Sequence, residues 1–329
     1  MVIRINALNH HKDNIGKSWD LSLQAFINDR KVNNLAKRTI EWYEEVLGNY
    51  LIPFVSKLKV DSPQEFTKEH LDAYIIYLRE VRNNQPSSIN TKLIPIRAFF
   101  NFLFENGYIP EKIKVKKLKA DTKVLKLFTE EDIRKIIERP DLEQCRFVAF
   151  RNWAICCFLL GTGVRLTTLV NIKIDDLDFV EKQIYLVKCK NRKQYVIPMS
   201  PKLESVLDAY LQIRNGELNN WLFVNRFGDK ISTKTVQSAV IDHCRRVGVS
   251  PGVRISPHTF RHQVASTLVK NGTDLLTTMN ILGQNSLAVL KRYVHLNTDD
   301  LKAHIGATPL DTSSQKQTKG RKAIKMKNH

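Results

Sequence analysis

The sequence lacks the patterns that would place a metal centre, a disulfide framework or a membrane span in the protein. Its five cysteines form no C-x-x-C pair and have no histidine pair at zinc-ligand spacing nearby, so we expect reduced and mostly buried thiols. The apolar run WAICCFLLGTGV is too short to cross a bilayer, and the first residues contain no signal-peptide core. We therefore expect a cytoplasmic protein with no membrane partner.

Acidic residues are scarce relative to basic ones. Lys and Arg number 52 against 33 Asp and Glu, which gives a net charge of +19. Such an excess attracts polyanions, although a basic surface also serves solubility or anionic membranes. The sequence contains no basic amphipathic helix with a broad apolar face, which would favour a membrane. It also contains no RRM or KH signature, which would favour RNA. Nucleic acid is therefore the leading predicted partner, with a cytosolic or nucleoid-associated location.

Nucleotide-binding motifs and internal repeats are also missing. Neither GxxxxGK[ST] nor GxGxxG occurs, so the use of a nucleoside triphosphate or a dinucleotide has no support. The chain of 329 residues with 43% hydrophobic residues is nevertheless long enough for substantial cores, and this length favours two domains.

Apolar residues recur at helical spacing in the first half of the chain. The patterns are LSLQAFINDR, AKRTIEWYEEVLGNYLIPF, FTKEHLDAYIIYLREV and SSINTKLIPIRAFFNFLFENGY. Thr67 is placed to cap the third helix, Pro95 predicts an irregularity in the fourth, and Asn106-Gly107 predicts its end. These patterns predict a short extension over residues 1–17, a helical domain over 18–108 and a lysine-rich linker over 109–127.

The second half predicts a domain of mixed composition. It begins at FTEEDIRKIIE, where Thr129 and Asp132 have a spacing close to a capping box. The extended segments IKIDDLDF, QIYLVK and QYVIPMS predict a small antiparallel sheet between helical patterns. The expected fold is therefore mainly α with a small antiparallel β-sheet, with an α+β domain over 128–305 and a polar, basic and flexible tail over 306–329.

A specific pattern of residues then extends through GTGVRLTTLVNI, SPHTFRHQVAS and ILGQNSLAVLKRYVHL. It consists of Arg165 in a TGxR context, His258-x-x-Arg261, Leu282-Gly283 and Tyr293. This order and spacing resemble the catalytic domain of the tyrosine recombinases, the phage integrase and Xer class. The resemblance covers about residues 18–300 and implies that the helical first half is a core-DNA-binding domain.

The resemblance implies a role for each residue. Arg165 and Arg261 would clamp a scissile phosphate, because planar guanidinium groups donate paired, charge-assisted hydrogen bonds to developing negative charge. His258 would assist proton transfer, His262 would support the site, and Tyr293 would be the nucleophile that forms a 3′-phosphotyrosyl link. Outside this pattern, a lone tyrosine in such a stretch is typical of a packed aromatic residue.

A general acid is also required to protonate the departing 5′-hydroxyl group. Alignment of LVKCKNRKQYVIPM with the family's hairpin puts Lys190 at the catalytic lysine position, although Cys189 stands where glycine is common. Lys188, Arg192 and Lys193 crowd the same turn, so Lys188 or Lys193 remains an alternative acid, and the whole turn is a candidate DNA contact.

Two positions depart from the family pattern. Gln284 follows Leu282-Gly283 where the family has histidine or tryptophan, and glutamine donates a hydrogen bond but carries neither a charge nor a transferable proton. Thr168 replaces an acidic residue, which predicts a less firmly oriented histidine. Slower but retained chemistry is expected.

The resemblance implies a DNA strand transferase that acts on double-stranded DNA with specific recombination sites and needs no metal, ATP or other cofactor. Strands would exchange through a Holliday junction held by a homotetramer on DNA, with a monomer expected in free solution. The short extension before the first helix favours a simple Xer-like or mobile-element recombinase. A type IB topoisomerase and a non-catalytic DNA-binding regulator on the same scaffold remain alternatives, and integration, excision, dimer resolution and inversion remain open.

Overall fold

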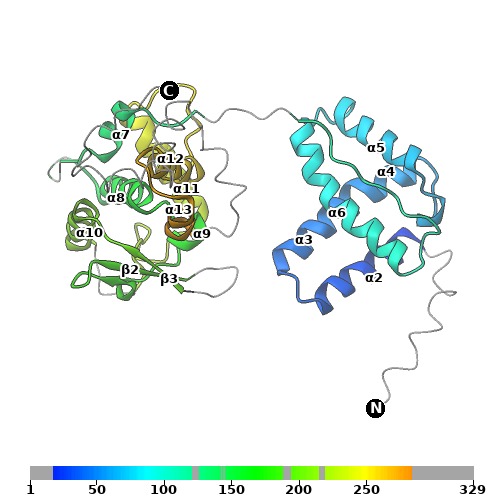
Figure 1. Cartoon of the computed structure of the whole chain (residues 1–329), viewed down its shortest axis with the longest axis horizontal. Helices are drawn as coiled ribbons and strands as arrows, with labels where there is room; N and C mark the ends of the chain where they lie inside the picture. Colours follow the sequence, from blue (N-terminus) through cyan, green and yellow to red (C-terminus); the bar gives the residue numbers. More distant parts are fainter. Residues whose placement is uncertain are drawn as a thin grey trace, which may run out of the picture. The chain divides into compact units, whose positions relative to one another are not determined.

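A computed structural model describes residues 18–120, 126–141, 143, 145–187, 194–214 and 219–283 of the chain. The chain divides into two compact units, Met1–Lys123 and Val124–His329. In Figure 1 the N-terminal unit runs from blue to cyan and the C-terminal unit from green to orange. No helix in the described ranges has both the length and the apolar character needed to cross a membrane.

The described part of the N-terminal unit is built from helices. They are α2 (Trp19–Val32), α3 (Lys37–Val46), α4 (Ile52–Lys57), α5 (Lys68–Glu80) and α6 (Pro86–Glu105). The helix predicted over AKRTIEWYEEVLGNYLIPF is present in three consecutive parts, because a π-helical turn at Leu47–Leu51 joins α3 to α4. Thr67 caps α5 in a capping box, and α6 continues through Pro95 to its predicted end at Asn106.

Aromatic residues dominate the core of the N-terminal unit. Trp19, Phe66 and Phe100 form one aromatic group, and the centroids of the Phe66 and Phe100 rings are 4.7 Å apart. Phe26 contacts Phe99 edge to face at 5.3 Å. Because aromatic rings bury large apolar areas, they give this unit a core of its own.

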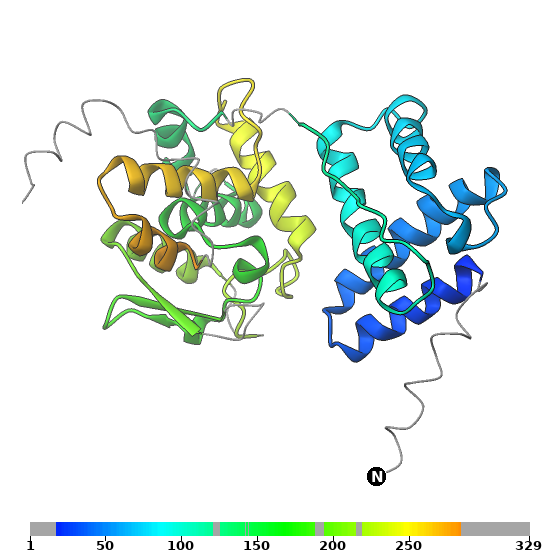
Figure 2. The same ribbon diagram turned by 45° about the vertical axis from the view of Figure 1, so that its right-hand side comes forward.

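Part of the predicted linker over 109–127 belongs to the N-terminal unit. The main chain of Leu118 exchanges two hydrogen bonds with the Asn90 side chain, and the Val115 carbonyl accepts from Arg97 at 2.6 and 2.9 Å. Figures 1 and 2 both show this segment running back along α6. These residues of the predicted linker therefore pack against the N-terminal unit, since Ile109 and Val115 supply buried apolar side chains among the lysines.

Helices α7 to α13 make up most of the described C-terminal unit. Their bounds are α7 (Glu130–Ile137), α8 (Phe147–Thr162), α9 (Leu166–Leu169), α10 (Pro201–Ile213), α11 (Thr233–Arg246), α12 (Pro257–Lys270) and α13 (Leu275–Leu282). Helix α8 is buried on nearly all sides and contacts α7, α10, α11 and α12. A helix that is apolar all round needs such a central position, and Figure 1 shows it there.

A small sheet lies at one edge of the C-terminal unit (Figure 2). It contains β1 (Leu177–Asp178), β2 (Gln183–Val187) and β3 (Gln194–Pro198) in that order, all antiparallel. Ile184, Leu186 and Ile197 face the core, whereas the cross-strand pair Tyr185 and Val196 is exposed, as the period of two along a strand requires. The predicted mainly α fold with a small antiparallel sheet is therefore confirmed, although most of IKIDDLDF is not strand.

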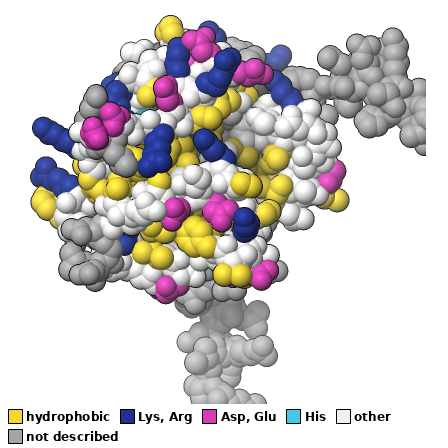
Figure 3. Space-filling view, turned by 90° about the vertical axis from the view of Figure 1, so that its left-hand side faces the viewer, with side chains coloured by type: hydrophobic (Ala, Val, Ile, Leu, Met, Phe, Trp, Pro, Cys, Tyr) yellow, Lys and Arg dark blue, Asp and Glu magenta, His cyan; other side chains and the backbone are white. Residues whose placement is uncertain are grey.

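Figure 3 shows one face of the C-terminal unit. Lys and Arg side chains are mixed there with Asp and Glu, and hydrophobic side chains reach the surface between them. Neither sign of charge is therefore gathered on this face.

Candidate active site

A cavity of about 460 Å³ brings three of the predicted site residues together. Arg165, His258 and Arg261 all line it, although Arg165 lies in the loop after α8 and the other two lie on α12. The remaining lining residues are Val164, Leu166, Thr167, Gln237, Arg254, Ser256, Pro257, Thr259 and His262. This convergence of basic side chains suits an anionic ligand.

Arg165 is presented by a sharp change of chain direction. Helix α8 ends at Gly163, whose φ of 61° lies in the left-handed region that glycine tolerates best, and Arg165 then begins α9 as its N-cap. A Cβ atom on Gly163 would lie 2.6 Å from Cδ2 of Leu282. The Nη1 atom of Arg165 donates to the carbonyl of Gly283 at 2.8 Å, which orients the guanidinium group.

Arg261 is buried on α12, and a different main-chain carbonyl holds its guanidinium group. Its Nη1 atom donates to the carbonyl of Gly163 at 2.8 Å. Its Nη2 atom is buried and has no hydrogen-bond partner among the described residues. Burial and, next, the positive charge of Arg165 lower the pKa of Arg261 to about 10, so the group is still protonated at neutral pH. A protonated, incompletely satisfied guanidinium group is suited to bind an anion.

His258 and His262 lie one turn apart near the start of α12. Ser256 caps this helix by accepting from the Thr259 main-chain nitrogen at 3.2 Å, which places His258 in the first turn. The rings of His258 and His262 meet edge to face with centroids 4.5 Å apart. His262 lines the same cavity as His258, because positions four apart on a helix are neighbours, and its supporting role stays a prediction.

Among the residues that line the cavity, the long polar side chains of Gln237 and Arg254 were not predicted as site residues from the sequence. Gln237 lies on α11, and Arg254 lies in the loop between α11 and α12, where its carbonyl accepts from the Thr259 hydroxyl. The only local signal for Arg254 is its place four residues before His258. Nothing in the sequence around Gln237 distinguishes it from other exposed helix residues.

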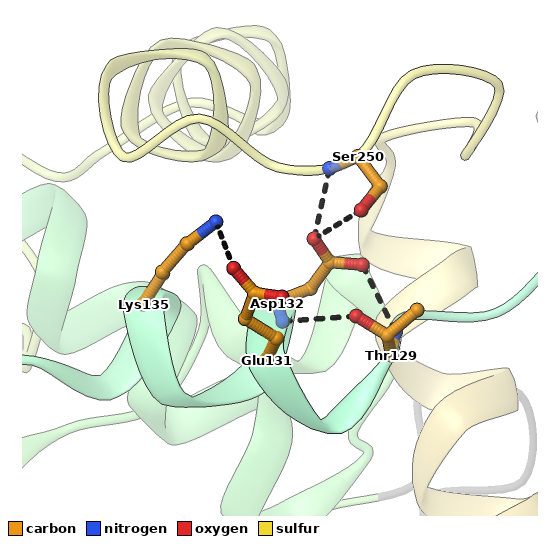
Figure 4. Close-up of polar contacts among 5 residues, drawn as sticks. All are labelled: Thr129, Glu131, Asp132, Lys135 and Ser250. Carbon is orange, nitrogen blue, oxygen red and sulfur yellow. Dashed lines mark hydrogen bonds and ion pairs between the residues drawn. The ribbon is translucent and has the colours of Figure 1, made fainter.

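The loop that carries Arg254 is tied to α7 by Asp132, as Figure 4 shows. This fully buried carboxylate accepts from the main-chain nitrogen and the hydroxyl of Ser250, both at 2.8 Å, and from the Thr129 nitrogen at 2.9 Å. Burial acts to raise the pKa of Asp132, but the hydrogen bonds from Ser250 and Thr129 outweigh it and lower that pKa to about 2. The predicted capping box is confirmed.

Several predicted site residues lie outside the described residues. They are Tyr293, Lys190, Gln284, Lys188, Arg192 and Lys193. The positions that flank them are described. Strand β2 ends at Val187 and β3 begins at Gln194, and these two residues are register partners. Helix α13 ends at Gly283. Thr168 is buried in α9, where its main-chain nitrogen donates to the Arg165 carbonyl at 2.9 Å. The structure therefore describes three members of the predicted catalytic set.

Comparison with known proteins identifies the family of the chain. Residues 126–300 match the phage integrase family, and residues 23–109 match the N-terminal SAM-like domain of phage integrases. The tyrosine recombinase XerC of Thermodesulfovibrio yellowstonii is 30% identical over 67% of this chain and 75% of its own length. The tyrosine recombinase XerA of Pyrococcus horikoshii is 27% identical over 86% of this chain and 92% of its own length.

Two solved structures share the fold. The integrase of transposon Tn1549, in complex with transposon right end DNA, has a TM-score of 0.70 at 16% identity and covers 87% of this chain and 98% of its own. A lambda integrase dimer bound to a core site has a TM-score of 0.65 at 17% identity, covering 82% of this chain and 96% of its own. Because the family match covers more than half of the sequence and the XerC relative is 30% identical, the chain belongs to the phage integrase family of tyrosine recombinases.

Proposed function

We propose that this protein is a site-specific DNA recombinase whose two cavity arginines clamp the scissile phosphate for attack by Tyr293. The observation that carries the proposal is the arrangement of Arg165 and Arg261. Both guanidinium groups line one cavity with His258, and the buried Nη2 atom of Arg261 has no hydrogen-bond partner among the described residues. A phosphate oxygen would satisfy that donor.

The chemistry requires stabilisation of negative charge. Attack on a phosphodiester gives a pentacoordinate transition state with more charge on the non-bridging oxygens than in the ground state. Arg165 and Arg261 are each fixed by a main-chain carbonyl at 2.8 Å, so their remaining donors are oriented before DNA binds. Preorganised donors of this kind lower the barrier most when charge develops during the reaction.

Proton transfer divides between two further side chains in this proposal. The Tyr293 hydroxyl has an ordinary pKa of about 10 and must lose its proton to attack. His258, at the cavity, takes part in that transfer, and Lys190 protonates the departing 5′-hydroxyl group. Gln284, which follows Gly283 in the sequence, contributes a hydrogen bond to the phosphate.

The proposed cycle conserves the energy of the phosphodiester bond. Tyr293 forms a bond to phosphorus while the bond to the 5′-oxygen breaks, which leaves a 3′-phosphotyrosyl link and a free 5′-hydroxyl group. A 5′-hydroxyl from a partner strand then attacks that link and releases Tyr293. Two DNA sites held by four protomers would exchange strands pairwise in this way through a Holliday junction. This assembly rests on family membership.

The family match does not favour the two alternatives raised by the sequence. A type IB topoisomerase would relax a supercoiled plasmid whether or not it carried paired sites. A non-catalytic regulator would bind DNA and form no covalent adduct. Expected locations in the cytoplasm and at the nucleoid follow from the DNA substrate and remain predictions.

The first step of the test is to find the DNA sequence that the protein binds. The side chains that contact bases are not known, so this sequence cannot be deduced from the protein. Duplexes with a randomised segment are selected for binding by the Tyr293→Phe variant, which retains the clamp and lacks the nucleophile. A nicked version of the selected duplex then traps cleavage, since the short strand beyond the scissile phosphate diffuses away. We expect a covalent adduct with the unaltered protein and none with Tyr293→Phe.

Recombination itself is measured on a plasmid that carries two copies of the selected site. Inversion or excision between the sites is the expected result, with no ATP or metal ion added. Relaxation of a plasmid without sites would favour the topoisomerase, and binding without any adduct would favour the regulator. An adduct that persists in Tyr293→Phe would overturn the assignment of the nucleophile.

A further inference from the structure

Tyr195 on β3 lies against the main chain of Gly283. A Cβ atom built on Gly283 would lie 2.9 Å from Cζ, 3.1 Å from Cε2 and 3.2 Å from the hydroxyl oxygen of Tyr195. These distances are shorter than ordinary van der Waals contacts, so the outer half of the ring closely covers the glycine. The contact joins the sheet to the end of α13, and the two elements also pack together along β3.

Gly283 is the residue that orients Arg165. Its carbonyl accepts from Nη1 of Arg165 at 2.8 Å, across 118 residues of sequence. Its φ of 59° places it in the left-handed region, where it ends α13 and turns the chain. A shift of the Gly283 peptide would therefore move the acceptor that holds the guanidinium group.

The position of Tyr195 is set by strand β3 and by the core against which its ring packs. Tyr195 and Ile197 are two positions apart, so their side chains leave β3 on the same, inner face. Ile197 is buried, and Tyr195 packs partly buried against the same core. Tyr195 also interacts electrostatically with Arg261 and acts to raise its pKa, whereas its connection to Arg165 runs through Gly283.

We propose that Tyr195 is a positioning residue for the arginine clamp: its ring sets the place of the Gly283 carbonyl, and that carbonyl sets the guanidinium group of Arg165. This inference rests on the proposed function, in which Arg165 binds the scissile phosphate. The position matters because a small misplacement of a preorganised donor costs much of its effect on the transition state. The same ring in a purely packing role would affect stability without a specific effect on Arg165.

The experiment measures single-turnover cleavage of the nicked duplex by four single variants and by the double variant that carries Tyr195→Ala in the Arg165→Lys background. Tyr195→Ala removes the ring, Tyr195→Phe keeps it, and Tyr185→Ala is the matched control, because Tyr185 is an exposed tyrosine of the neighbouring strand. Arg165→Lys weakens the clamp but retains a charge. DNA affinity and the thermal midpoint are recorded for each variant.

We expect Tyr195→Ala to slow cleavage by about ten-fold or more, as loss of transition-state contacts does. Its DNA affinity should remain within about two-fold of the unaltered protein, because most phosphate contacts are retained. Tyr195→Phe should recover most of the rate, and Tyr185→Ala should match the unaltered protein. In the Arg165→Lys background, Tyr195→Ala should have less than about a two-fold further effect, since residues that act through one another are not additive.

Each other outcome is decisive. Equal slowing by Tyr195→Ala in both backgrounds, or no slowing at all, would show that the tyrosine does not act through Arg165. Failure of Tyr195→Phe to recover the rate would exclude the ring as the positioning element. If the unaltered protein forms no adduct, or if Arg165→Lys cleaves at its full rate, the proposed function itself fails and the inference falls with it.

Discussion

The Nη1 atom of Arg261 donates to the carbonyl of Gly163 at 2.8 Å, across 98 residues of sequence. Gly163 ends α8 and stands two residues before Arg165. Arg261 therefore holds the stretch of backbone that positions Arg165. Arg165 is held in turn by the Gly283 carbonyl, so two left-handed glycines join α8, α12 and α13 around one cavity.

Gly163→Ala should disrupt this linkage. Its φ of 61° costs an alanine about 1–2 kcal/mol. The new methyl group, 2.6 Å from Leu282 Cδ2, should add about 1–3 kcal/mol of overpacking. Denaturant unfolding measures the sum of these two losses of stability. The rate of single-turnover cleavage should fall as well.

Gly248→Ala is the control for the backbone strain. Its φ of 71° is similar, but a Cβ atom there would meet nothing within 4 Å. Gly248→Ala should lower the free energy of unfolding by only the backbone strain of about 1–2 kcal/mol, and it should leave the cleavage rate unchanged. If both variants lose the same stability, the contact with Leu282 does not matter.

Arg261→Lys should slow strand cleavage by about 100-fold or more. Lysine retains the charge but cannot donate to the Gly163 carbonyl and to a phosphate with one planar group. Cleavage of the nicked duplex at saturating protein is the measurement. The control is Arg134→Lys, which alters an exposed arginine of α7 that does not line the cavity. Full cleavage by Arg261→Lys would remove this arginine from the clamp.

Asp132→Asn tests the tie between α7 and the loop that carries Arg254. Because the folded pKa of about 2 is below the ordinary value of 3.8, the carboxylate stabilises the fold above about pH 4. That contribution is lost as the pH falls toward 2. At pH 7 the variant should be less stable by about 2 kcal/mol.

The measurement is urea unfolding from neutral to acidic pH. The difference between Asp132→Asn and the unaltered protein should narrow as the pH falls below 4. Glu131→Gln is the control, since Glu131 makes an exposed ion pair with Lys135 at 2.7 Å (Figure 4) and should leave the midpoint nearly unchanged. A constant difference at every pH would contradict the role of the charge.

Arg254→Ala should weaken DNA binding in a way that depends on salt. Arg254 is exposed and lines the cavity, where its charge would meet a DNA phosphate. The slope of log affinity against log salt should decrease by about one, with similar weakening on all sequences. Arg134→Ala should keep the original slope. An unchanged slope in Arg254→Ala would exclude the phosphate contact.

Local features of the fold could be predicted because neighbouring residues cause them. Thr129 and Asp132 were recognised as a capping box from their spacing, and the strands after Asp176 from their extended pattern. The π-helical turn at Leu47–Leu51 was not foreseen, because the apolar spacing remains helical through it. The packing of Val115 was missed because isolated apolar residues among lysines resemble a linker.

The sequence by itself determined most of the helices, the pair of strands β2 and β3, the positive charge and the arginine and histidine pattern, since each depends on residue type and short spacing. Only the tertiary structure decided that Ser250 binds Asp132, that Arg261 holds Gly163 and that Tyr195 covers Gly283. The first two are hydrogen bonds across about a hundred residues, and the third is a close contact between a strand and a helix end. Such contacts depend on the path of the chain in space, and short spacings in the sequence do not record that path.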